Sequence, residues 1–437
     1  GMSEGIRAAG SAVIVISGKS GVTVGAEKGF REAHKKGIAT LFFVNKIDNE
    51  NADFYKVFEE LKATFGPMVC PIVVPCYKEG APTCYVNLLE YKAYTYSGGK
   101  ATEVPIPDMG HRLDGLRTAI YEAVAETSEE LMEKYFSGEE FTPDELILGL
   151  ATGVRKGDIA PVFFGSALNN FGVKELLDCF IRIAPSPRPI HAVERVVDPN
   201  EDNFTGFIFK IHANMDPNHR SCIAFVKICS GRFERNANYK HVRFGKMMRF
   251  SSPTAFMAQK KEVVDEAFAG DIIGLPDTGN FKIGDTLTSG EELHFKGLPS
   301  FSPEMFKYIE NADPMKAKQL NKGIEQLMDE GVAQLFTNQF NGRKIIGTVG
   351  QLQFEVIQYR LLNEYNASCR WEPLSLYKAC WIESDDLEEL EAFKKRKYQY
   401  MAKDREGRDV FLADSNYVLQ MAQMDFKNIR FHFTSEF

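Results

Sequence analysis

Two short polar segments carry residue types that could recognise a purine base. Asn45-Lys46-Ile47-Asp48 and Gly165-Ser166-Ala167-Leu168 each directly follow an apolar run. The carboxylate of Asp48 can accept hydrogen bonds from both the N1–H and the exocyclic amine of guanine, whereas adenine offers no matching pair of donors. Lys46 can lie over the base, Asn45 can tie neighbouring loops together, and the small residues at 165–167 can bring backbone N–H groups up to the guanine carbonyl. The first segment alone fits a polar turn equally well, but the two together favour guanine recognition.

A third segment ends like a phosphate-binding loop, but we do not expect it to be one. Gly18-Lys19-Ser20 supplies the last three residues of the pattern Gly-x-x-x-x-Gly-Lys-Ser/Thr, yet Val13 stands where the first glycine belongs. Residues 13–17 have the composition of a strand, so no nest of backbone N–H groups can surround a phosphate there. Asp108-Met109-Gly110-His111 departs by one residue from the pattern Asp-x-x-Gly-His, and we interpret it as a turn before a helix.

The two guanine segments need a parallel sheet to bring them together. Apolar runs predict strands, and amphipathic patterns predict helices between them. The predicted strands are 12–17, 40–44, 69–74 and 161–164, and the predicted helices are 24–36, 54–65 and 173–183. Wholly apolar strands that alternate with helices indicate a parallel sheet covered on both faces. Ligands bind at the carboxyl edge of such a sheet, where both guanine segments would lie.

The interval between the two guanine segments predicts an inserted subdomain. Asp48 and Ser166 are 118 residues apart (166 − 48), far more than one strand and one helix need. We expect the insertion at about 76–140, weakly patterned to residue 110 and helical from 111 to about 137. Thr142-Pro143-Asp144-Glu145 then predicts a helix start, with Thr as N-cap and Glu returning the capping hydrogen bond.

The remainder of the chain predicts two further domains. The segment Ala-Pro-Ser-Pro-Arg-Pro at 184–189 is a stiff linker that ends a first domain of residues 1–190. Short alternating segments with Gly-containing turns predict a β-barrel at 203–292. Mixed patterns predict an α+β domain of ferredoxin-like type at 297–437, with a sheet covered on one side. Its helix at 351–364 carries Leu352, Val356, Tyr359 and Leu362 on one face.

Composition excludes several classes of protein. The 437 residues include no apolar run long enough for a membrane span, and the N-terminus has no signal-like segment. The eight cysteines form no Cys-x-x-Cys pair, which argues against a zinc site or a disulfide framework and favours reduced thiols in the cytoplasm. His34, His212 and His219 lie in polar segments without the neighbours that catalysis or metal binding needs. We therefore expect no metal site of the chain's own.

Two basic clusters are candidates for RNA contact, although the net charge of −8 argues against a general nucleic-acid coat. The clusters are Arg243, Lys246 and Arg249, and Lys394, Lys395, Arg396 and Lys397. For each cluster taken alone, a solvated surface is the commoner explanation.

These motifs, in this order, resemble the translational GTPases. The guanine segments with an insertion between them, the proline linker, a β-barrel and an α+β domain follow the arrangement of that family. Residues up to about 160 are most similar to the elongation factor G type, in RAAGSAVIVISGKSGV, FFVNKIDNENADFYKV and EELMEKYFSGEEFTPDEL. From PVFFGSALNNFGV onward the chain resembles peptide chain release factor 3, in FTGFIFKIHANMDPNHR, VGQLQFEVIQYRLLNEYN and FHFTSEF. A divergent subfamily and a fusion would both account for the two resemblances.

The resemblance implies a cytoplasmic, ribosome-dependent factor that uses GTP or GDP and recycles the release factors that read stop codons. Its partners would be the ribosome, ribosomal RNA and class I release factors, with no membrane. The family's phosphate loop, switch threonine and Asp-x-x-Gly-His element are not found, so we expect a truncated GTP-binding domain that does not hydrolyse GTP alone. Mg²⁺ is expected only in an intact protein. The alternatives are an elongation-factor-G-like or ribosome-protection GTPase, and a non-enzymatic guanine- or ribosome-binding module.

Overall fold

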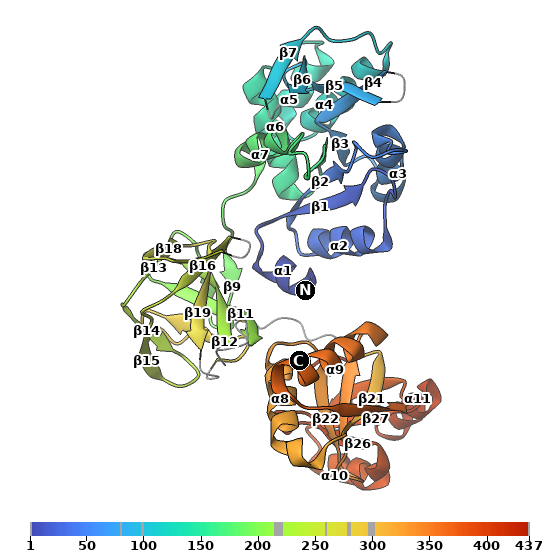
Figure 1. The fold of residues 1–437 in the computed structure, drawn as a ribbon, viewed down its shortest axis with the longest axis vertical. Coiled ribbons are helices and arrows are strands. Elements are labelled where there is room, and N and C mark those ends of the chain that lie inside the picture. The colour runs from blue at the N-terminus through green and yellow to red at the C-terminus, as the bar shows by residue number, and fades with distance from the viewer. Residues whose placement is uncertain are drawn as a thin grey trace. The chain divides into compact units, whose positions relative to one another are not determined.

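The computed structural model describes residues 2–78, 81–97, 100–213, 222–257, 260–277, 281–295 and 302–435. The chain divides into two compact units, Gly1–Arg188 and Pro189–Phe437 (Figure 1). His219, one of the histidines noted in the sequence, lies outside the described residues.

The first unit is built on a parallel sheet with the strand order β1-β2-β8-β3. These strands are β1 (Ser11–Ser17), β2 (Ala39–Asn45), β8 (Ala160–Phe164) and β3 (Val69–Pro71). The helices around it are α1 (Met2–Ala8), α2 (Val24–Lys35), α3 (Phe54–Phe65), α6 (Pro143–Lys156) and α7 (Val173–Ile183). Phe42 of β2 stacks on Phe30 of α2 and on Phe65 of α3, each at a ring-centroid distance of 5.3 Å. These rings pack α2 and α3 onto the sheet, and the same buried cluster continues into the inserted part.

Strand β1 is covered less completely than its composition predicts. Among the described strands it pairs only with β2, so it forms one edge of the sheet. Val13 and Val15 are 39% and 58% exposed, whereas Ile16, on the opposite face of the strand, is buried. The run of apolar residues is real, but only one face of this edge strand is packed.

The predicted strand at 69–74 is divided between two sheets. β3 ends at Pro71, and β4 (Val73–Lys78) begins an antiparallel sheet that also contains β5 (Ala81–Asn87), β6 (Lys92–Ser97) and β7 (Lys100–Val104). Ile72 joins the two sheets, because its N–H donates to the carbonyl of Val162 and its carbonyl accepts from the N–H of Leu88. A single apolar stretch thus serves both the parallel sheet and the inserted part.

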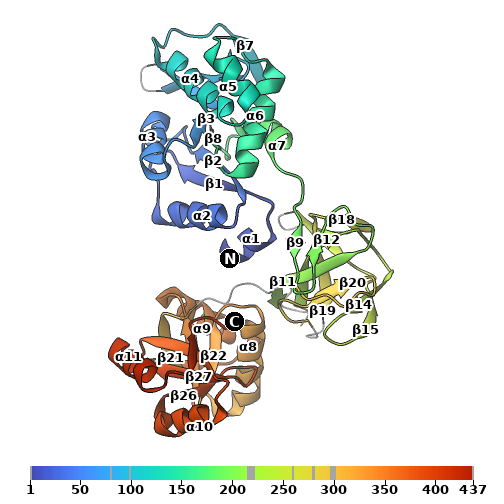
Figure 2. The ribbon, with the colours of Figure 1, turned by 180° about the vertical axis from the view of Figure 1, so that it is seen from behind.

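Helices α4 (Arg112–Ala125) and α5 (Glu129–Phe136) complete the inserted part, and α4 packs on α5 and α6 (Figure 2). Helix α6 begins as the sequence predicts. Thr142 Oγ1 accepts from the N–H of Glu145 at 3.2 Å, and Glu145 Oε2 accepts from the N–H of Thr142 at 2.7 Å. This reciprocal pair is a capping box, with Pro143 in the first turn.

The second unit opens with a curved antiparallel sheet that forms a half-barrel. Its strand order is β15-β14-β20-β11-β12-β19-β16-β17, and β13 and β18 pair beside it. The strands are β11 (Thr205–Ala213), β12 (Cys222–Ser230), β13 (Arg232–Glu234), β14 (Asn238–His241), β15 (Lys246–Arg249), β16 (Thr254–Met257), β17 (Lys260–Val263), β18 (Glu266–Phe268), β19 (Ile272–Asp277) and β20 (Thr286–Thr288), preceded by β9 (Ile190–His191) and β10 (Val196–Val197). A buried cluster that includes Phe204, Phe233 and Tyr239 forms its core.

The C-terminal part contains two successive βαββαβ units in one eight-stranded sheet of order β24-β21-β23-β22-β26-β27-β25-β28. The first consists of β21 (Met305–Asn311), α8 (Ala317–Asp329), β22 (Gln334–Asn338), β23 (Lys344–Thr348), α9 (Gln351–Tyr365) and β24 (Cys369–Leu374). The second consists of β25 (Lys378–Glu383), α10 (Leu387–Arg396), β26 (Met401–Lys403), β27 (Asp409–Ala413), α11 (Asn416–Asp425) and β28 (Arg430–His432). Each has the strand order of a ferredoxin-like fold, so the predicted architecture occurs twice.

The helix-free face of this sheet is buried rather than open. A cluster that includes Phe306, Tyr308 and Phe336 from the first half also includes Trp381 and Leu412 from the second. Alternate residues of the same strands face the helices. The strands of each half therefore contact their own helices through one face and the other half of the C-terminal part through the opposite face. The expected sheet covered on one side is therefore covered on both.

Helix α9 packs through a face other than the one its pattern suggests. Phe354, Ile357 and Leu361 are fully buried against the sheet. The predicted set of Leu352, Val356, Tyr359 and Leu362 lies on the exposed side of the helix, with exposures between 42% and 69%. Both faces of the helix are apolar, so the pattern alone could not decide between them.

Across the described ranges, no helix combines the length and the apolar character needed to cross a bilayer. The seven cysteines with described side chains are all free thiols.

Candidate functional site

The two guanine segments leave neighbouring parallel strands at the same edge of the sheet. Val44 of β2 pairs with Phe164 of β8, so the residues that follow each strand emerge side by side. The N–H of Gly165 donates to the carbonyl of Val44 at 2.9 Å, and the N–H of Ile47 donates to the carbonyl of Gly165 at 3.2 Å. The backbone thus joins the two loops before any side chain takes part.

Asp48 is held from the second loop. Ser166 Oγ donates to Asp48 Oδ2 at 2.9 Å, and Asn169 Nδ2 donates to the same oxygen. Ser166 is only 2% exposed, while Asp48 is exposed. Among the described residues, nothing donates a hydrogen bond to Asp48 Oδ1. The carboxylate is therefore oriented by one oxygen and offers the other to solvent.

Asn45 ties the loops together from the opposite side. Its Oδ1 accepts hydrogen bonds from the N–H of Lys46 at 2.8 Å and from the N–H of Ala167 at 2.9 Å. The Ala167 amide, which the sequence offers to a guanine carbonyl, is thereby occupied. The next amide, that of Leu168, has no acceptor within the described part of the chain.

The other predicted residues of the first loop differ in exposure. Lys46 is exposed and has a φ of 61°, so its backbone turns away from the strand. Ile47 is 2% exposed and packs in the core, where it anchors the loop. In the second loop, the Leu168 side chain is 93% exposed.

Two glycines allow the second loop to close on itself. The N–H of Ser166 donates to the carbonyl of Phe171 at 2.9 Å, and the N–H of Phe171 donates back at 3.0 Å. A Cβ on Gly165 would lie 2.0 Å from the Phe171 carbonyl oxygen, and a Cβ on Gly172 would lie 2.1 Å from the Phe164 oxygen. The sequence Gly-Ser-Ala-Leu-Asn-Asn-Phe-Gly therefore forms this turn because only hydrogen fits at its two ends.

The inserted sheet supports this loop through aromatic packing. Phe171 meets Tyr85 of β5 and Tyr96 of β6 edge-on, at centroid distances of 5.9 and 5.3 Å. Tyr85 is 1% exposed, and its hydroxyl donates to Glu175 Oε1 at 2.6 Å. Burial and the neighbouring Glu175 carboxylate raise the pKa of Tyr85 above its ordinary value, so the phenol stays protonated. Sequence reasoning missed Phe171 and Asn169, although the aromatic residue and the amide both lie within the turn that follows Ser166.

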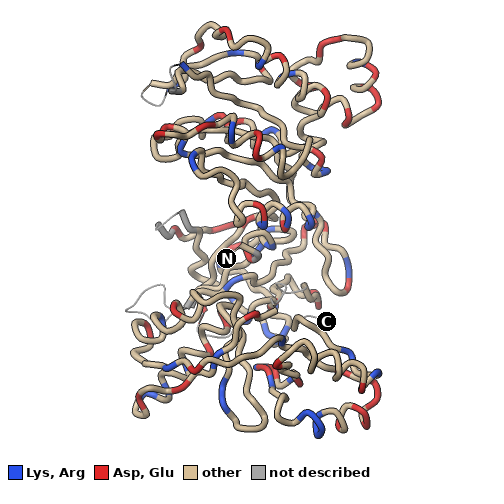
Figure 3. The backbone as a smooth tube through the Cα atoms, turned by 90° about the vertical axis from the view of Figure 1, so that its right-hand side faces the viewer, with Lys and Arg blue, Asp and Glu red and all other residues tan. Residues whose placement is uncertain are grey.

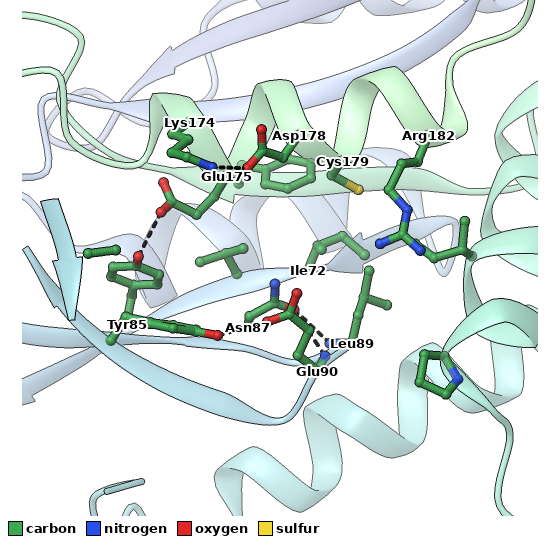
Figure 4. A pocket seen from close by; sticks show the side chains of 16 residues that line it. Ile72, Tyr85, Asn87, Leu89, Glu90, Lys174, Glu175, Asp178, Cys179 and Arg182 are labelled. Carbon is green, nitrogen blue, oxygen red and sulfur yellow. Dashed lines mark hydrogen bonds and ion pairs between the residues drawn. The ribbon is translucent and has the colours of Figure 1, made fainter. Parts of the chain in front are cut away.

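A cavity of about 250 Å³ lies between the inserted sheet and α7 (Figure 4). The Tyr85–Glu175 hydrogen bond lies along its wall, with Asn87 and Glu90 on the sheet side and Asp178 and Arg182 on α7. Its lining includes none of the predicted residues of the guanine loops.

Gly18-Lys19-Ser20 forms a turn after β1. Ser17 Oγ accepts from the N–H groups of Lys19 and Ser20 at 3.3 and 3.4 Å, and the N–H of Gly21 donates to the Ser17 carbonyl at 3.0 Å. These amides bind Ser17, so they form no cradle for a phosphate.

The first basic cluster is partly neutralised. Arg243 donates from Nε to Asp285 Oδ1 at 2.6 Å and from a second nitrogen to Oδ2 at 2.7 Å. His241, which is fully buried, contacts the same carboxylate. Lys246 and Arg249, at the two ends of β15, are exposed.

The second basic cluster is divided in the same way. Lys394 pairs with Glu391 at 2.9 Å and with Asp409 at 2.8 Å, and Arg396 pairs with Asp425 at 3.2 Å.

Lys395 is exposed and Lys397 half-buried, and neither forms an ion pair with a residue that the structure describes. Basic and acidic residues are interspersed along the trace in Figure 3. Lys395, Lys397, Lys246 and Arg249 are therefore the cations of the two clusters best placed to meet an external anion.

The described residues contain no group of three or more His, Cys, Asp or Glu side chains that could hold a metal ion. At the two loops, one hydrogen-bond acceptor and one donor have no partner among the described residues. Asp48 Oδ1 is an open acceptor, the Leu168 amide is an open donor, and Lys46 is exposed beside them.

Three family models match successive parts of the chain. Residues 1–186 match the family model described as the elongation factor Tu GTP binding domain, and residues 203–290 match elongation factor G domain 2. Residues 295–423 match the class II release factor RF3, C-terminal domain.

A solved structure from Thermus thermophilus is similar over 88% of this chain, with 25% identity and a TM-score of 0.73. The chain spans 58% of the length of that protein. The order of the three matched domains and the fold agree with the resemblance seen in the sequence, and the chain belongs to the translational GTPase family.

Proposed function

We propose that the loops after β2 and β8 bind the guanine base of GTP or GDP. Asp48 accepts hydrogen bonds from the N1–H and the exocyclic amine, and the Leu168 amide donates to the guanine carbonyl. Lys46 lies over the base, while Asn45 and Ser166 hold the two loops in place. The single observation that supports this most directly is the Ser166–Asp48 hydrogen bond of 2.9 Å, which orients an exposed carboxylate.

The second part of the proposal concerns the residues that would bind the phosphates of GTP and catalyse its hydrolysis. The 437 residues contain no Gly-x-x-x-x-Gly-Lys-Ser/Thr pattern. The Lys19 and Ser20 amides donate to Ser17 Oγ, and the Gly18 amide donates to the carbonyl of Asn45. Phosphoryl transfer depends on groups that cradle the phosphates, bind Mg²⁺ and orient the nucleophile. We infer that residues 1–437 by themselves recognise the base without hydrolysing GTP, and that Mg²⁺ binds only where a phosphate loop is also present.

On the ribosome, we propose a role like that of peptide chain release factor 3 in termination, in the cytoplasm. The match of residues 295–423 to the RF3 C-terminal domain supports this choice over an elongation-factor-G-like or ribosome-protection role. The proposed partners are the ribosome with its RNA and the class I release factors. A non-enzymatic module that binds only guanine or the ribosome is the second candidate, because such a module needs no phosphate-binding residues.

A base-switch experiment tests the guanine site. Titration of the 437-residue polypeptide, followed by ligand-observed NMR, should show guanosine binding and no adenosine binding. Asp48→Asn should weaken guanosine binding and favour xanthosine, because an amide supplies one acceptor and one donor to a base with N1–H and a carbonyl at C2. Asp144→Asn, at an exposed position in the first turn of α6, is the matched control and should change neither affinity. Equal binding of adenosine and guanosine would refute the site.

A second experiment separates the candidate functions. Sedimentation with ribosomes should carry the polypeptide into the pellet, and GDP should bind no more tightly than guanosine with or without Mg²⁺. Multiple turnover of GTP in the presence of ribosomes would overturn the non-hydrolysing assignment. Guanosine binding without any ribosome association would leave only the guanine-binding module.

A further inference from the structure

Asn169 occupies part of the Asp48 carboxylate. Its side-chain nitrogen donates to Asp48 Oδ2, the oxygen that also accepts from Ser166 Oγ at 2.9 Å. The backbone N–H of Asn169 donates to Ser166 Oγ at 3.4 Å, so the three residues form a closed network. One carboxylate oxygen thus already has two protein donors.

The turn that carries Asn169 is fixed by its own backbone. The N–H of Asn170 donates to the carbonyl of Ala167 at 3.4 Å, and Asn170 adopts a φ of 52°. The Ser166–Phe171 pair closes the same turn. Asn169 is therefore presented to Asp48 by a short loop and does not reach it from a flexible segment.

Guanine and hypoxanthine differ in the group that this arrangement affects. Both bases have an N1–H donor, but only guanine has an exocyclic amine, and that amine needs the second carboxylate oxygen. Asp48 Oδ1 is open to the N1–H, whereas Oδ2 is shared with Ser166 and Asn169. A guanine amine that takes Oδ2 would therefore displace the Asn169 donor, so it would replace one hydrogen bond and add none.

We propose that Asn169 is a specificity-determining residue that reduces the discrimination between guanine and hypoxanthine nucleosides. The inference rests on the proposed guanine site. Both bases bind through N1–H and the Asp48 carboxylate, and Asn169 takes the contact that would otherwise favour guanine. Adenine remains excluded, because it has no N1–H to donate.

The test compares guanosine with inosine as probes. In the wild-type chain, the two dissociation constants should lie within a few-fold of each other. Asn169→Ala should leave inosine binding nearly unchanged and tighten guanosine binding by on the order of tenfold, as expected when a hydrogen bond to a charged group becomes available to the ligand. Asn169→Ser, with a hydroxyl too short to reach as far, should behave in the same way.

Asn170→Gly is the matched control, since it changes the adjacent amide and keeps the positive φ. It should leave the guanosine-to-inosine ratio at the wild-type value. A ratio that does not change in both Asn169 variants would overturn the inference while the guanine site stands. Failure of both nucleosides to bind the wild-type chain would instead overturn the site and the inference together.

Discussion

Ser166 donates a hydrogen bond of 2.9 Å to Asp48, although 118 residues separate them in the sequence. Strand pairing makes this possible, because β2 and β8 are neighbours in the sheet. The chain leaves the sheet after β3, forms the inserted part, and returns through α6 to β8. The geometry at the proposed base site consequently depends on how the insertion supports the second loop. Substitutions in the loop, in its support and among the charges of the second unit should reveal these dependences.

Gly165→Ala should disrupt the second loop. The added Cβ would lie 2.0 Å from the Phe171 carbonyl oxygen, so the Ser166–Phe171 pair must move apart. We expect a loss of about 1–3 kcal/mol in the free energy of unfolding of the first unit and weaker guanosine binding. Urea unfolding and nucleoside titration would measure the two effects. Gly115→Ala in α4, where a Cβ meets nothing within 4 Å, should instead stabilise slightly; similar effects of both changes would contradict this account.

Tyr85→Phe should destabilise the support between the inserted sheet and α7. The change removes the hydroxyl that donates to Glu175 Oε1. The other carboxylate oxygen, Oε2, is already buried without a partner among the described residues, so the carboxylate would lose its donor from Tyr85 as well. A loss of about 1–3 kcal/mol in the free energy of unfolding is expected. The control is Tyr94→Phe, whose hydroxyl donates to the exposed Glu90. That control should lose less, and equal losses would argue against a special role for the Tyr85 contact.

Asp285→Asn should make the second unit less sensitive to acid. Burial opposes the charge of Asp285, but hydrogen bonds from Arg243, His241 and the Lys282 amide outweigh it, so the pKa lies below its ordinary 3.8. Stability from a lowered carboxyl pKa is fully present above the unfolded-state value and is lost as pH falls through the folded-state value. The wild type should therefore exceed the variant by about 2–3 kcal/mol at pH 5–7, and the gap should narrow below about pH 4.

Urea midpoints measured between pH 3 and pH 7 would follow this gap. The control is Asp265→Asn, because Asp265 pairs with Arg235 with its own side chain 85% exposed. Its effect should stay within about 0.5 kcal/mol throughout. A gap for Asp285→Asn that is independent of pH would show that the carboxylate charge is not what stabilises the network.

Replacement of Lys395 and Lys397 by Ala should weaken ribosome binding more than it weakens the fold. Neither side chain forms an ion pair with a described residue, so both are available to phosphates. If both contact RNA, the dependence of log K on log salt should become shallower by about one to two. Co-sedimentation at several salt concentrations would measure this. Lys318→Ala with Lys322→Ala, exposed on α8, is the control pair, and an equal effect there would indicate a non-specific charge contribution.

Local patterns were sufficient for the positions of the polar loops and for the order of fold types. Asn45 ends one buried strand and Asp48 follows it, while Ser166 follows another, so the carboxyl edge of a parallel sheet was the expected meeting point. The roles within the loops were less accessible. Asn169 reaches Asp48 only because a tight turn brings it there, and no periodicity in the sequence predicts that turn.

Other features depended on tertiary contacts that apolar patterns do not distinguish. The run at 69–74 is apolar throughout, yet Ile72 divides it between two sheets. Helix α9 has two apolar faces, and the one that carries Phe354 and Ile357 is buried in the core cluster. The repeated βαββαβ unit was not predicted either, and it is seen in the strand order of the two halves.

The two βαββαβ units of the C-terminal part pack on each other as the subunits of an obligate dimer do, but they belong to one chain. β22 and β26 are joined by only two residue pairs, Thr337 with Lys403 and Asn338 with Ala402, while the broad apolar face behind them is common to both copies. Each copy therefore shields the strand edge and the hydrophobic face of the other. If the chain were cut in the short loop at 375–377, each half would expose the apolar face that the other half now covers. The intact loop holds the two halves in one molecule, so this face stays covered.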